Sequence, residues 1–287
     1  FVAPIHQLAG ATHRLGAGKY TVKIPDTRQD EFGQLARDFN GLANILAQNE
    51  KLRRDFVADI SHELRTPLAI LTGEIEAIQD GIRQPTPEAL TSLQHEIQSL
   101  TRLVDDLYQL ALSDVGGLRY QMQPVDLVAL TQQAAQPFFE RMLEHGLTLQ
   151  LALPEQPIQI HADTARLHQL ITNLLENSVR YTDAGGVVQL SVQAVDGMAI
   201  LDCQDSAPSV DAADLPRLFE RLYRVEGSRN RATGGAGLGL PLCQSIVEAH
   251  HGHIHAQSSA QGGLWLRVQL PLSESAPAGS APHSSTP

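Results

Sequence analysis

The segment Asp55–Leu68 places one histidine beside a carboxylate on a helix whose apolar side points elsewhere. Apolar residues recur along this helix at intervals of three and four, ending with Phe56 and Ile60. At about 100° per residue, His62 lies roughly 120° around the helix from Phe56 and roughly 160° from Ile60. The imidazole is therefore expected to face water, with Glu63 next to it. A neutral imidazole beside a carboxylate that accepts its proton is suited to act as a nucleophile.

A second polar set lies on the helix expected over residues 164–181. Leucines and one isoleucine fill one side of this helix. Its polar face repeats at intervals of three and four residues and comprises Asn173, Asn177, Arg180 and Tyr181. Amide oxygens one turn apart, with a cation beside them, can bind a metal ion and a polyphosphate. By itself, such a face is more simply explained as a solvated polar surface, as is an isolated His–Glu pair.

Two further features favour a ligand that carries phosphate. Asp205 ends the apolar strand predicted to begin at Met198, and the ends of strands often hold ligands. Gly234–Leu240 opens the last predicted helix, where glycines allow close approach of the backbone and free N–H groups attract phosphate. This loop is neither a Walker A motif nor a Rossmann fingerprint. The polar segment Val225–Thr233 before it is expected to act as a mobile lid.

The elements that precede and carry His62 are predicted to be helical. The first helix covers about residues 1–15, and a short extended piece follows it. A second helix begins near Asp30–Phe32, runs through His62 and ends at Gly81–Pro87. Pro67 lies inside this helix, so the pattern predicts a kink or a loosening one turn after His62.

A third helix is predicted from about Glu88 to Ser113, and it carries two apolar rows with a seven-residue repeat. One row comprises Leu93, Leu100 and Leu107, and the other comprises Leu90, Ile97, Val104 and Ala111. A hairpin of two helices with such narrow seams cannot bury them alone. Two hairpins joined as a four-helix bundle can, so a homodimer is expected.

Beyond Gly116–Gly117 the pattern changes to strands and helices. The expected strands are Leu147–Leu153, Val187–Val195, Met198–Cys203 and Leu264–Leu270. The expected helices are Leu127–His145, Thr164–Tyr181 and Gly237–His251. Because no regular βαβ rhythm is present, these elements favour an α+β sandwich with helices on one face of a mixed sheet. From Ser273 the composition of Ser, Pro and Ala predicts a disordered tail.

The composition excludes several classes of protein. A net charge of −11 over 287 residues, with no long basic run, argues against a nucleic-acid partner. Cys203 and Cys243 lie in apolar segments without CxxC spacing, which indicates core thiols in a reducing compartment. The histidines of the segment His250–His255 have no acidic or cysteine partner at a recognised spacing, so no metal site is expected there.

The order of these motifs resembles that of the sensor histidine kinases of two-component signalling. SHELRTPL, which contains His62, is similar to the family's H box, and Asn173–Thr182 is similar to its N box. Asp205 matches the adenine-reading aspartate of the first glycine box. Leu218–Arg224 resembles the F box, and Gly235–Leu240 resembles the second glycine box. Each motif alone is moderately specific, whereas all five in this order leave chance as a poor explanation.

The resemblance extends from about residue 1 to residue 272 and implies a multidomain protein. The implied parts are a HAMP linker at 1–50, a dimerisation and histidine-phosphotransfer hairpin at 51–116, a catalytic ATP-binding domain with an α+β sandwich fold at 117–272, and the tail at 273–287. Within the family, the runs GEIEAIQDG, QDSAP and EGSRNRATGGAGLGL resemble most a member that senses envelope stress.

The resemblance also implies an activity. ATP would phosphorylate His62, with Glu63 as base and Mg²⁺ held by Asn177, and the phosphoryl group would pass to an aspartate of a response regulator. The order Glu63-Leu64-Arg65-Thr66 resembles the family's phosphatase motif, in which Thr66 orients a water. The positions implied in nucleotide binding are Asn173, Asn177, Arg180, Tyr181, Asp205, Tyr223, Gly235, Gly237, Leu238, Gly239 and Leu240, with Arg224 implied in catalysis.

The sequence departs from the family pattern after Asp205, where Ala207 and Ser209 stand in place of glycines. A stiffer loop is expected there, with the Asp205 carboxylate still in place. No segment reaches the length of a membrane span and no signal peptide is present, while the chain opens at Phe1 without a methionine. The chain is therefore interpreted as the cytoplasmic portion of an inner-membrane protein, anchored by segments outside this sequence.

Two other functions are compatible with parts of the sequence. Another ATPase of the same superfamily, such as a chaperone or a mismatch-repair ATPase, would need a glutamate base on the N-box helix, and Glu176 lies on a different face from Asn177. The hairpin that carries His62 would have no role in such an enzyme. A non-catalytic dimeric scaffold is the third possibility, and the presence of Asn177, Asp205 and the glycine loop argues against it.

Overall fold

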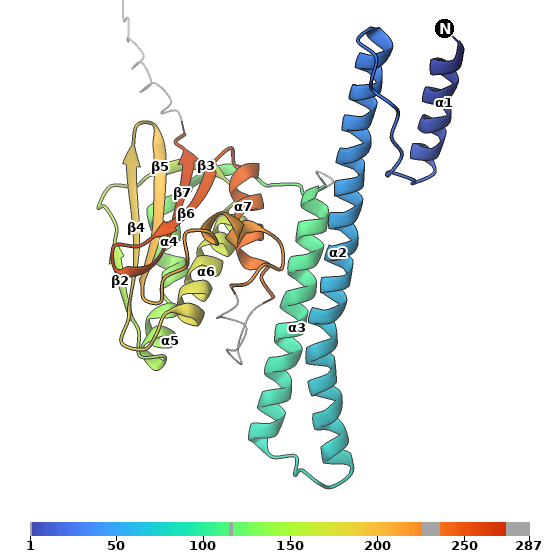
Figure 1. Cartoon of the computed structure of the whole chain (residues 1–287). Coiled ribbons are helices and arrows are strands. Elements are labelled where there is room, and N and C mark those ends of the chain that lie inside the picture. The colour runs from blue at the N-terminus through green and yellow to red at the C-terminus, as the bar shows by residue number, and fades with distance from the viewer. Residues whose placement is uncertain (1, 115–116, 226–235, 274–287) are drawn as a thin grey trace, which may run out of the picture. The chain divides into compact units, whose positions relative to one another are not determined.

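The computed structural model describes residues 2–114, 117–225 and 236–273 (Figure 1). The chain divides into two compact units, Phe1–Thr86 and Pro87–Pro287. Most of the predicted tail and most of the predicted lid lie outside the described residues, as does Gly235.

The first unit contains two helices, α1 (Val2–Gly16) and α2 (Glu31–Gln79), and both confirm the helical predictions. Its core joins the two helices to the segment between them and comprises Ala11, Leu15, Val22, Ile24, Ala36, Phe39 and Ala43. Asn40 fixes that segment, because its amide accepts from the Ile24 N–H at 2.9 Å and donates to the Ile24 carbonyl at 2.8 Å. The α2 helix remains helical through Pro67.

The second unit begins with helix α3 (Pro87–Asp114), close to the predicted range. Its other helices are α4 (Leu127–Ala135), α5 (Phe138–Glu144), α6 (Thr164–Tyr181) and α7 (Gly239–Ala249), with a short 3₁₀ helix η1 (Leu215–Phe219). Its strands are β1 (Gln123–Asp126), β2 (Thr148–Ala152), β3 (Gln159–Ala162), β4 (Val187–Val195), β5 (Met198–Ser206), β6 (His253–Ser258) and β7 (Gly262–Pro271).

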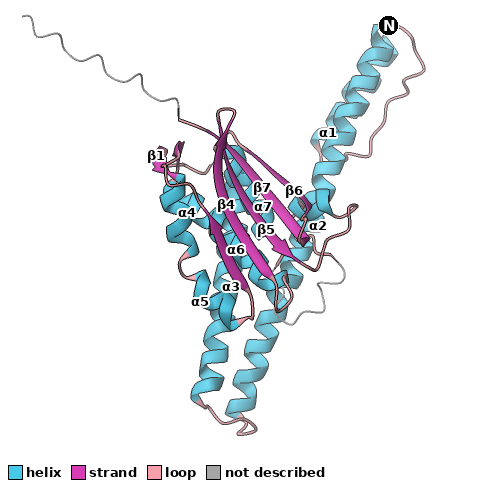
Figure 2. Cartoon of the chain, turned by 90° about the vertical axis from the view of Figure 1, so that its left-hand side faces the viewer, coloured by secondary structure: helices cyan, strands magenta, loops and turns pink. Residues whose placement is uncertain are grey.

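Five of these strands form a mixed sheet in the order β2-β4-β5-β7-β6. β2 pairs with β4 in parallel, and the other neighbours pair antiparallel. Figure 2 shows the sheet from its open side, with α4, α6 and α7 behind it. The predicted α+β sandwich, with helices on one face of a mixed sheet, is therefore confirmed.

Several boundaries differ from the sequence-based prediction. The single helix expected over Leu127–His145 is two helices, because Pro137 has no N–H to continue α4 and instead caps α5. Strands β1, β3 and β6 were not predicted. The first two have only four residues each and form a two-stranded sheet with one another, so neither gives a long alternating pattern. β6 is an edge strand whose polar side chains are exposed.

The α6 helix builds the centre of this unit. Its buried side comprises Leu167, Leu170, Ile171, Leu174, Leu175, Ser178 and Val179. Asp163 caps its first turn by accepting from the Arg166 N–H at 3.1 Å. The half-buried polar residues that the sequence placed on another face of α6 are where the 3.6-residue period predicts.

In the histidine-rich segment His250–His255, the buried His250 has a structural role. His250 is buried, donates from Nδ1 to the Ile246 carbonyl at 2.7 Å and accepts from the Asp163 N–H at 2.9 Å through Nε2. Burial lowers the pKa of this imidazole, so the neutral ring is the folded form. Over the described residues, no three His, Cys, Asp or Glu side chains gather in a way that could hold a metal ion.

Both cysteines are buried, and burial raises the pKa of each thiol. Core positions are thus confirmed for Cys203 and Cys243. None of the helices within 2–114, 117–225 and 236–273 is long and apolar enough to cross a membrane.

Candidate functional site

His62 lies on an exposed face of α2, as the helical spacing predicted, and Glu63 beside it is half-buried. The Thr66 hydroxyl donates to the His62 carbonyl at 3.3 Å, so it is bonded to the helix backbone one turn after the histidine.

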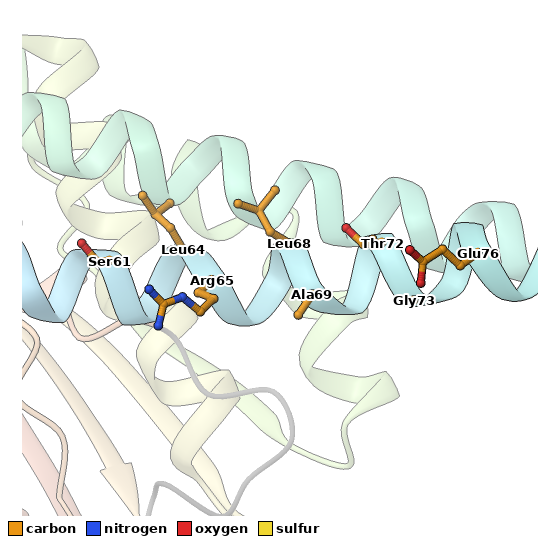
Figure 3. Close-up of a pocket in the computed structure, with 8 residues that line it drawn as sticks. All are labelled: Ser61, Leu64, Arg65, Leu68, Ala69, Thr72, Gly73 and Glu76. Atoms are coloured by element: carbon orange, nitrogen blue, oxygen red, sulfur yellow. The ribbon is translucent and has the colours of Figure 1, made fainter.

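A hollow of about 610 Å³ lies along α2 beside His62, and every residue that lines it belongs to this helix. Figure 3 shows Leu64, Leu68 and Thr72 along one side of the helix, and Arg65 and Ala69 along another. The surface next to the exposed imidazole is therefore partly apolar.

In the second unit, Asp205 is the buried centre of the site, with 6% of its surface exposed. Its Oδ2 accepts from the Ser178 hydroxyl at 3.0 Å, and its Oδ1 accepts from the Leu264 N–H at 2.7 Å. Burial raises the pKa of this carboxyl to about 6, although both hydrogen bonds favour the ionised form. The carboxylate thus joins β5 to α6 and to β7.

An irregularity in the sheet explains why Asp205 can do this. The register between β5 and β7 shifts between Gln204 and Ser206, so Asp205 has no direct partner on β7. Its carboxylate accepts a hydrogen bond from the Leu264 N–H, which has no backbone acceptor on β5 at this point of the sheet. Gly263 leaves the space that this needs, because a Cβ there would collide with the Asp205 carboxylate and the Ser206 carbonyl.

Asn177 directly precedes Ser178, whose hydroxyl bonds to this carboxylate, so the polar face of α6 lies one position around the helix from that contact. Two polar atoms here are buried without a hydrogen-bond partner among the described residues, the Asn173 Nδ2 and the Thr182 hydroxyl. Buried polar groups are seldom left unpaired, so each is a candidate contact for a ligand. Glu176, by contrast, is paired with Arg141, whose Nη2 lies 2.8 Å from Oε2.

The second glycine motif meets the F-box segment. Gly237 has a φ of +68°, and the Leu222 N–H donates to its carbonyl at 3.0 Å. A Cβ at Gly237 would lie 2.9 Å from the Tyr223 carbonyl oxygen, so glycine is required by both conformation and space. α7 begins at Gly239, two residues later than predicted, and over the described residues no side chain caps its start.

Tyr223 and Arg224 follow η1. The Tyr223 hydroxyl donates to Asp214 at 2.6 Å, and the Arg217 guanidinium lies 4.0 Å from the centre of the Tyr223 ring. Arg224 is half-buried, as are Asn177, Arg180, Tyr181 and Leu240, while Leu238 is buried. Gly235 lies outside the described part of the chain.

The fold thus brings together the predicted residues of the second unit. The α6 and α7 helices pack together, and Asp205 contacts α6 through Ser178. Two contributing residues were missed from the sequence, Ser178 and Gly263. A polar residue on the apolar stripe of α6 was the signal for Ser178, and a Gly-Gly pair directly before a predicted strand was the signal for Gly263.

This arrangement can bind a ligand that offers hydrogen-bond donors at one end and negative charge at the other. The Asp205 carboxylate accepts from an amine, and amides and a cation on α6 are ligands for a metal-bound polyphosphate. The N–H groups at the start of α7 favour phosphate.

Comparison with known families finds three matches. Residues 1–48 match the HAMP domain, residues 52–116 match the His Kinase A (phospho-acceptor) domain, and residues 162–274 match the Histidine kinase-, DNA gyrase B-, and HSP90-like ATPase family.

Individual relatives carry the same combination. Over 271 residues the chain is 55% identical to the signal transduction histidine-protein kinase BaeS of Escherichia coli (strain K12), which covers 94% of this chain and 58% of that protein. The Acinetobacter baumannii histidine kinase AdeS is 28% identical with a TM-score of 0.62, over 74% of this chain and 98% of that one. Full-length ShkA in complex with AMPPNP is 27% identical with a TM-score of 0.56, over 78% and 47% respectively.

Because Asp205 is buried, its ionised carboxylate is expected to lower the free energy of unfolding of the unliganded protein near neutral pH. Because the folded-state pKa is raised to about 6, the stability that the carboxyl contributes is complete below its unfolded pKa and is lost as pH rises through about 6. Asp205→Asn keeps an acceptor for the Leu264 N–H and carries no charge. At pH 7.5 it should therefore raise the free energy of unfolding by about 1–3 kcal/mol.

Urea denaturation of the wild-type chain and the variant at pH 4.5 and pH 7.5 measures this difference. The gain should be largest at pH 7.5 and should shrink at pH 4.5, where the wild-type carboxyl is largely protonated when folded. A variant that is less stable than wild type at pH 7.5 would show that the charge is well compensated.

Proposed function

Because this chain belongs to the sensor histidine kinases, we propose that it transfers the γ-phosphoryl group of ATP to His62 and then to an aspartate of a response regulator. The observation that carries the proposal is the buried Asp205 carboxylate beside the polar face of α6, in a chain that also exposes His62 on α2. The similarity to a kinase solved with AMPPNP supports ATP as the nucleotide.

The chain supplies two groups for the first transfer. A ring nitrogen of His62 attacks the γ-phosphorus, and the bond from that phosphorus to the bridging oxygen breaks as ADP leaves with the electron pair. Glu63 accepts the proton from the imidazole, which keeps the attacking nitrogen neutral. We assign Arg224 to the charge that develops on the transferred group.

Adenine and phosphates would occupy different parts of the site. Asp205 accepts from the exocyclic amine of adenine, and the unpaired hydroxyl of Thr182 lies near that end of α6. Phosphate oxygens face Arg180, Tyr181 and Tyr223. The start of α7, from Gly235 and Gly237 to Leu238, Gly239 and Leu240, offers backbone N–H groups to the same oxygens.

We propose that Asn177 holds Mg²⁺ with Asn173 one turn away. Amide oxygens are hard ligands that suit this ion. The unpaired atom of Asn173 is Nδ2, a donor, so it would bond to an oxygen of the nucleotide rather than to the metal. When bound, Mg²⁺ would neutralise part of the charge on the phosphate oxygens.

A response-regulator receiver domain must reach His62, and the exposed imidazole beside the hollow on α2 allows this. We also propose a phosphatase activity toward that regulator, in which Thr66 orients the attacking water. The hydroxyl would have to exchange its present bond to the His62 carbonyl for a bond to that water.

A homodimer is supported by the apolar row that α3 leaves in contact with water. Leu90 and Ile97 are each 54% exposed and Val104 is 49% exposed, at intervals of seven residues. Such a row on a helix of 28 residues is the pattern of a coiled-coil seam.

We propose the cellular setting of the kinase from its similarity to known proteins. The HAMP match at residues 1–48 and the similarity to BaeS support a membrane sensor kinase. This chain would be the cytoplasmic portion of that inner-membrane protein. Signalling of envelope stress is the proposed output. Another ATPase of the superfamily is disfavoured because Glu176, the candidate water-activating base, is paired with Arg141.

His62→Gln should abolish phosphorylation of the chain by labelled ATP and leave nucleotide affinity within about twofold of wild type. The imidazole is the proposed nucleophile, and it lies in a different unit from the nucleotide residues. Acid-labile, base-stable label on the wild type and none on the variant would support the proposal.

Thr66→Ala is the matched control for that assay, because it removes a neighbouring polar group without touching the nucleophile. It should be labelled at nearly the wild-type rate and should dephosphorylate the regulator several-fold more slowly. Label on His62→Gln at the wild-type level would contradict the assignment of the nucleophile.

Asn177→Ala should weaken ATP binding in the presence of Mg²⁺ by about tenfold or more and should have a much smaller effect in EDTA. Titration calorimetry in the two buffers measures both values. Gln244→Ala, at a half-buried polar residue on α7, is the control and should bind like wild type. Equal losses with and without the metal would assign Asn177 to the nucleotide alone.

Replacing Ile97 and Val104 by lysine should convert a two-chain species into a single chain at micromolar concentration, because charges would be buried in the apolar seam. Sedimentation equilibrium gives the mass directly. Gln94→Lys, at an exposed polar position on the same helix, should leave the dimer intact. A wild-type chain that sediments as a monomer would remove the basis of the proposal.

A further inference from the structure

The edge strand β6 presents two histidines on the same side. Along this strand His253 and His255 are exposed, whereas Ile254 and Ala256 between and after them are half-buried. Because side chains of a strand alternate between its two faces, the two imidazoles share one face. Figure 2 shows β6 at the margin of the sheet, next to β7. The pair is therefore open to solvent and to any ion dissolved in it.

That face is the open side of the sheet. The Cys203 side chain of β5 points toward α6, where it contacts the Ser178 hydroxyl, so the preceding Asp202 points away from the helices. Arg267 of β7 lies opposite Asp202, and His255 of β6 lies opposite Arg267. Residues directly opposite one another in a sheet share a face, so both histidines lie on the side that no helix covers.

The two imidazole rings lie side by side. Their centres are 6.4 Å apart and their planes are inclined by 25°. Neither His253 nor His255 forms a hydrogen bond or an ion pair with another side chain within residues 2–114, 117–225 and 236–273. The ring nitrogens of both residues therefore remain available to a ligand from outside this part of the chain.

A metal ion can join the two rings after a small movement of the side chains. Imidazole nitrogens bind transition metals at about 2.0–2.1 Å, which places the centres of two neighbouring ligand rings roughly 4.5–5.2 Å apart. The rings of His253 and His255 must therefore approach each other by only about 1–2 Å. Exposed imidazoles rotate about χ1 and χ2 without any movement of the backbone, so the pair can close on an ion.

The positive charge nearest the pair is already neutralised. A free guanidinium opposite His255 would repel a cation, and Arg267 occupies that position. Its Nε and Nη2 donate to the buried Asp202 carboxylate at 2.8 and 2.9 Å. Gln269, which lies opposite His253, carries no charge. The Arg267–Asp202 ion pair thus removes the main electrostatic obstacle to a cation on this face.

The donor atoms select the class of ion. Neutral imidazole suits Cu²⁺, Ni²⁺ and Zn²⁺, whereas Mg²⁺ and Ca²⁺ prefer oxygen ligands. Cu²⁺ binds most tightly among the divalent ions of the first transition row. Two protein ligands leave the other positions of the ion to water, so the affinity should be lower than that of a closed structural site with four protein ligands.

We propose that His253 and His255 form a surface site that chelates a divalent transition-metal ion, with Cu²⁺ bound more tightly than Ni²⁺ or Zn²⁺. This site goes beyond the proposed kinase function and is separate from the Mg²⁺ that Asn177 would hold. The sequence pattern did not indicate it because β6 was not predicted as a strand. Only in a strand do residues two positions apart share a face.

Trp265 is an intrinsic reporter for this site, and it is the only tryptophan in the sequence. It lies two residues before Arg267 on β7 and therefore on the same face as the histidines. Its opposite residue on β6 is Gln257, so Trp265 is a diagonal neighbour of His255. Diagonal neighbours in a sheet lie about 7–8 Å apart, which is close enough for a bound Cu²⁺ to quench the indole fluorescence.

Titration of the full chain with CuCl₂ at pH 7.5, followed by the fluorescence of Trp265, tests the proposal. The emission should lose most of its intensity in a saturable manner and should recover when EDTA is added. Zn²⁺ does not quench indole, so it should restore the emission by displacing Cu²⁺, at concentrations above that of the copper. Millimolar Mg²⁺ should neither quench the emission nor displace the copper.

His253→Gln and His255→Gln should each weaken the affinity for Cu²⁺ by at least about tenfold, because one imidazole alone cannot chelate the ion. His161→Gln makes the same change at an exposed position on β3 and is the matched control, which should titrate like wild type. Both test positions are exposed, so the fold should be retained. Equal unfolding temperatures of all four proteins in EDTA verify this.

The outcomes decide the site without reference to ATP, so they do not depend on the proposed kinase function. Equal affinities of the wild type and both β6 variants for Cu²⁺ would overturn the site. An equal loss of affinity in His161→Gln would show adventitious binding to exposed histidines instead. A loss in only one of the two β6 variants would contradict chelation by the pair.

Discussion

The candidate nucleotide site depends on one buried carboxylate at an irregular point of the sheet. Asp205 replaces a missing rung between β5 and β7 by accepting the Leu264 N–H, and it anchors α6 by accepting the Ser178 hydroxyl. Removing that acceptor would leave a buried backbone donor without a partner, which costs more than a typical hydrogen bond contributes. The same side chain therefore holds the layers together and presents the charge that a purine amine would meet.

Two buried groups of this unit respond to pH in opposite directions. The raised pKa of Asp205 means that its contribution to stability is lost as pH rises through about 6. The lowered pKa of His250 means that its contribution is present above the ordinary imidazole pKa and is lost as pH falls below it. Near neutrality the fold thus keeps His250 neutral and tolerates a charged Asp205. Near neutral pH Asp205 is therefore mostly ionised, which suits hydrogen bonding to a ligand, although the protonated form would stabilise the fold more.

The sequence predicted those features that local periodicity determines. The amphipathic pattern of α6 gives its bounds and both of its faces, and the long apolar pattern of α2 survives a proline because helical bonds on either side continue. The motif order predicted the family. Features that depend on distant partners were not predictable. Strands β1 and β3 pair with one another across 33 or more residues, and the bulge at Asp205 exists only in the register of β5 against β7. The bond between Ser178 and Asp205 joins residues 27 positions apart, so no local pattern encodes it.

The α3 helix has two different surfaces, of which the seven-residue apolar repeat in its sequence reveals only one. Its sequence was interpreted through two heptad rows, and the row of Leu90, Ile97 and Val104 is exposed as a dimer seam would require. The compact unit, however, begins at Pro87 and includes α3 with the nucleotide-binding fold. The residues responsible are mostly polar, Asp106, Gln109 and Ser113, which an apolar pattern passes over. Contacts between polar side chains of distant elements follow no local period, so the sequence pattern does not predict this face of α3.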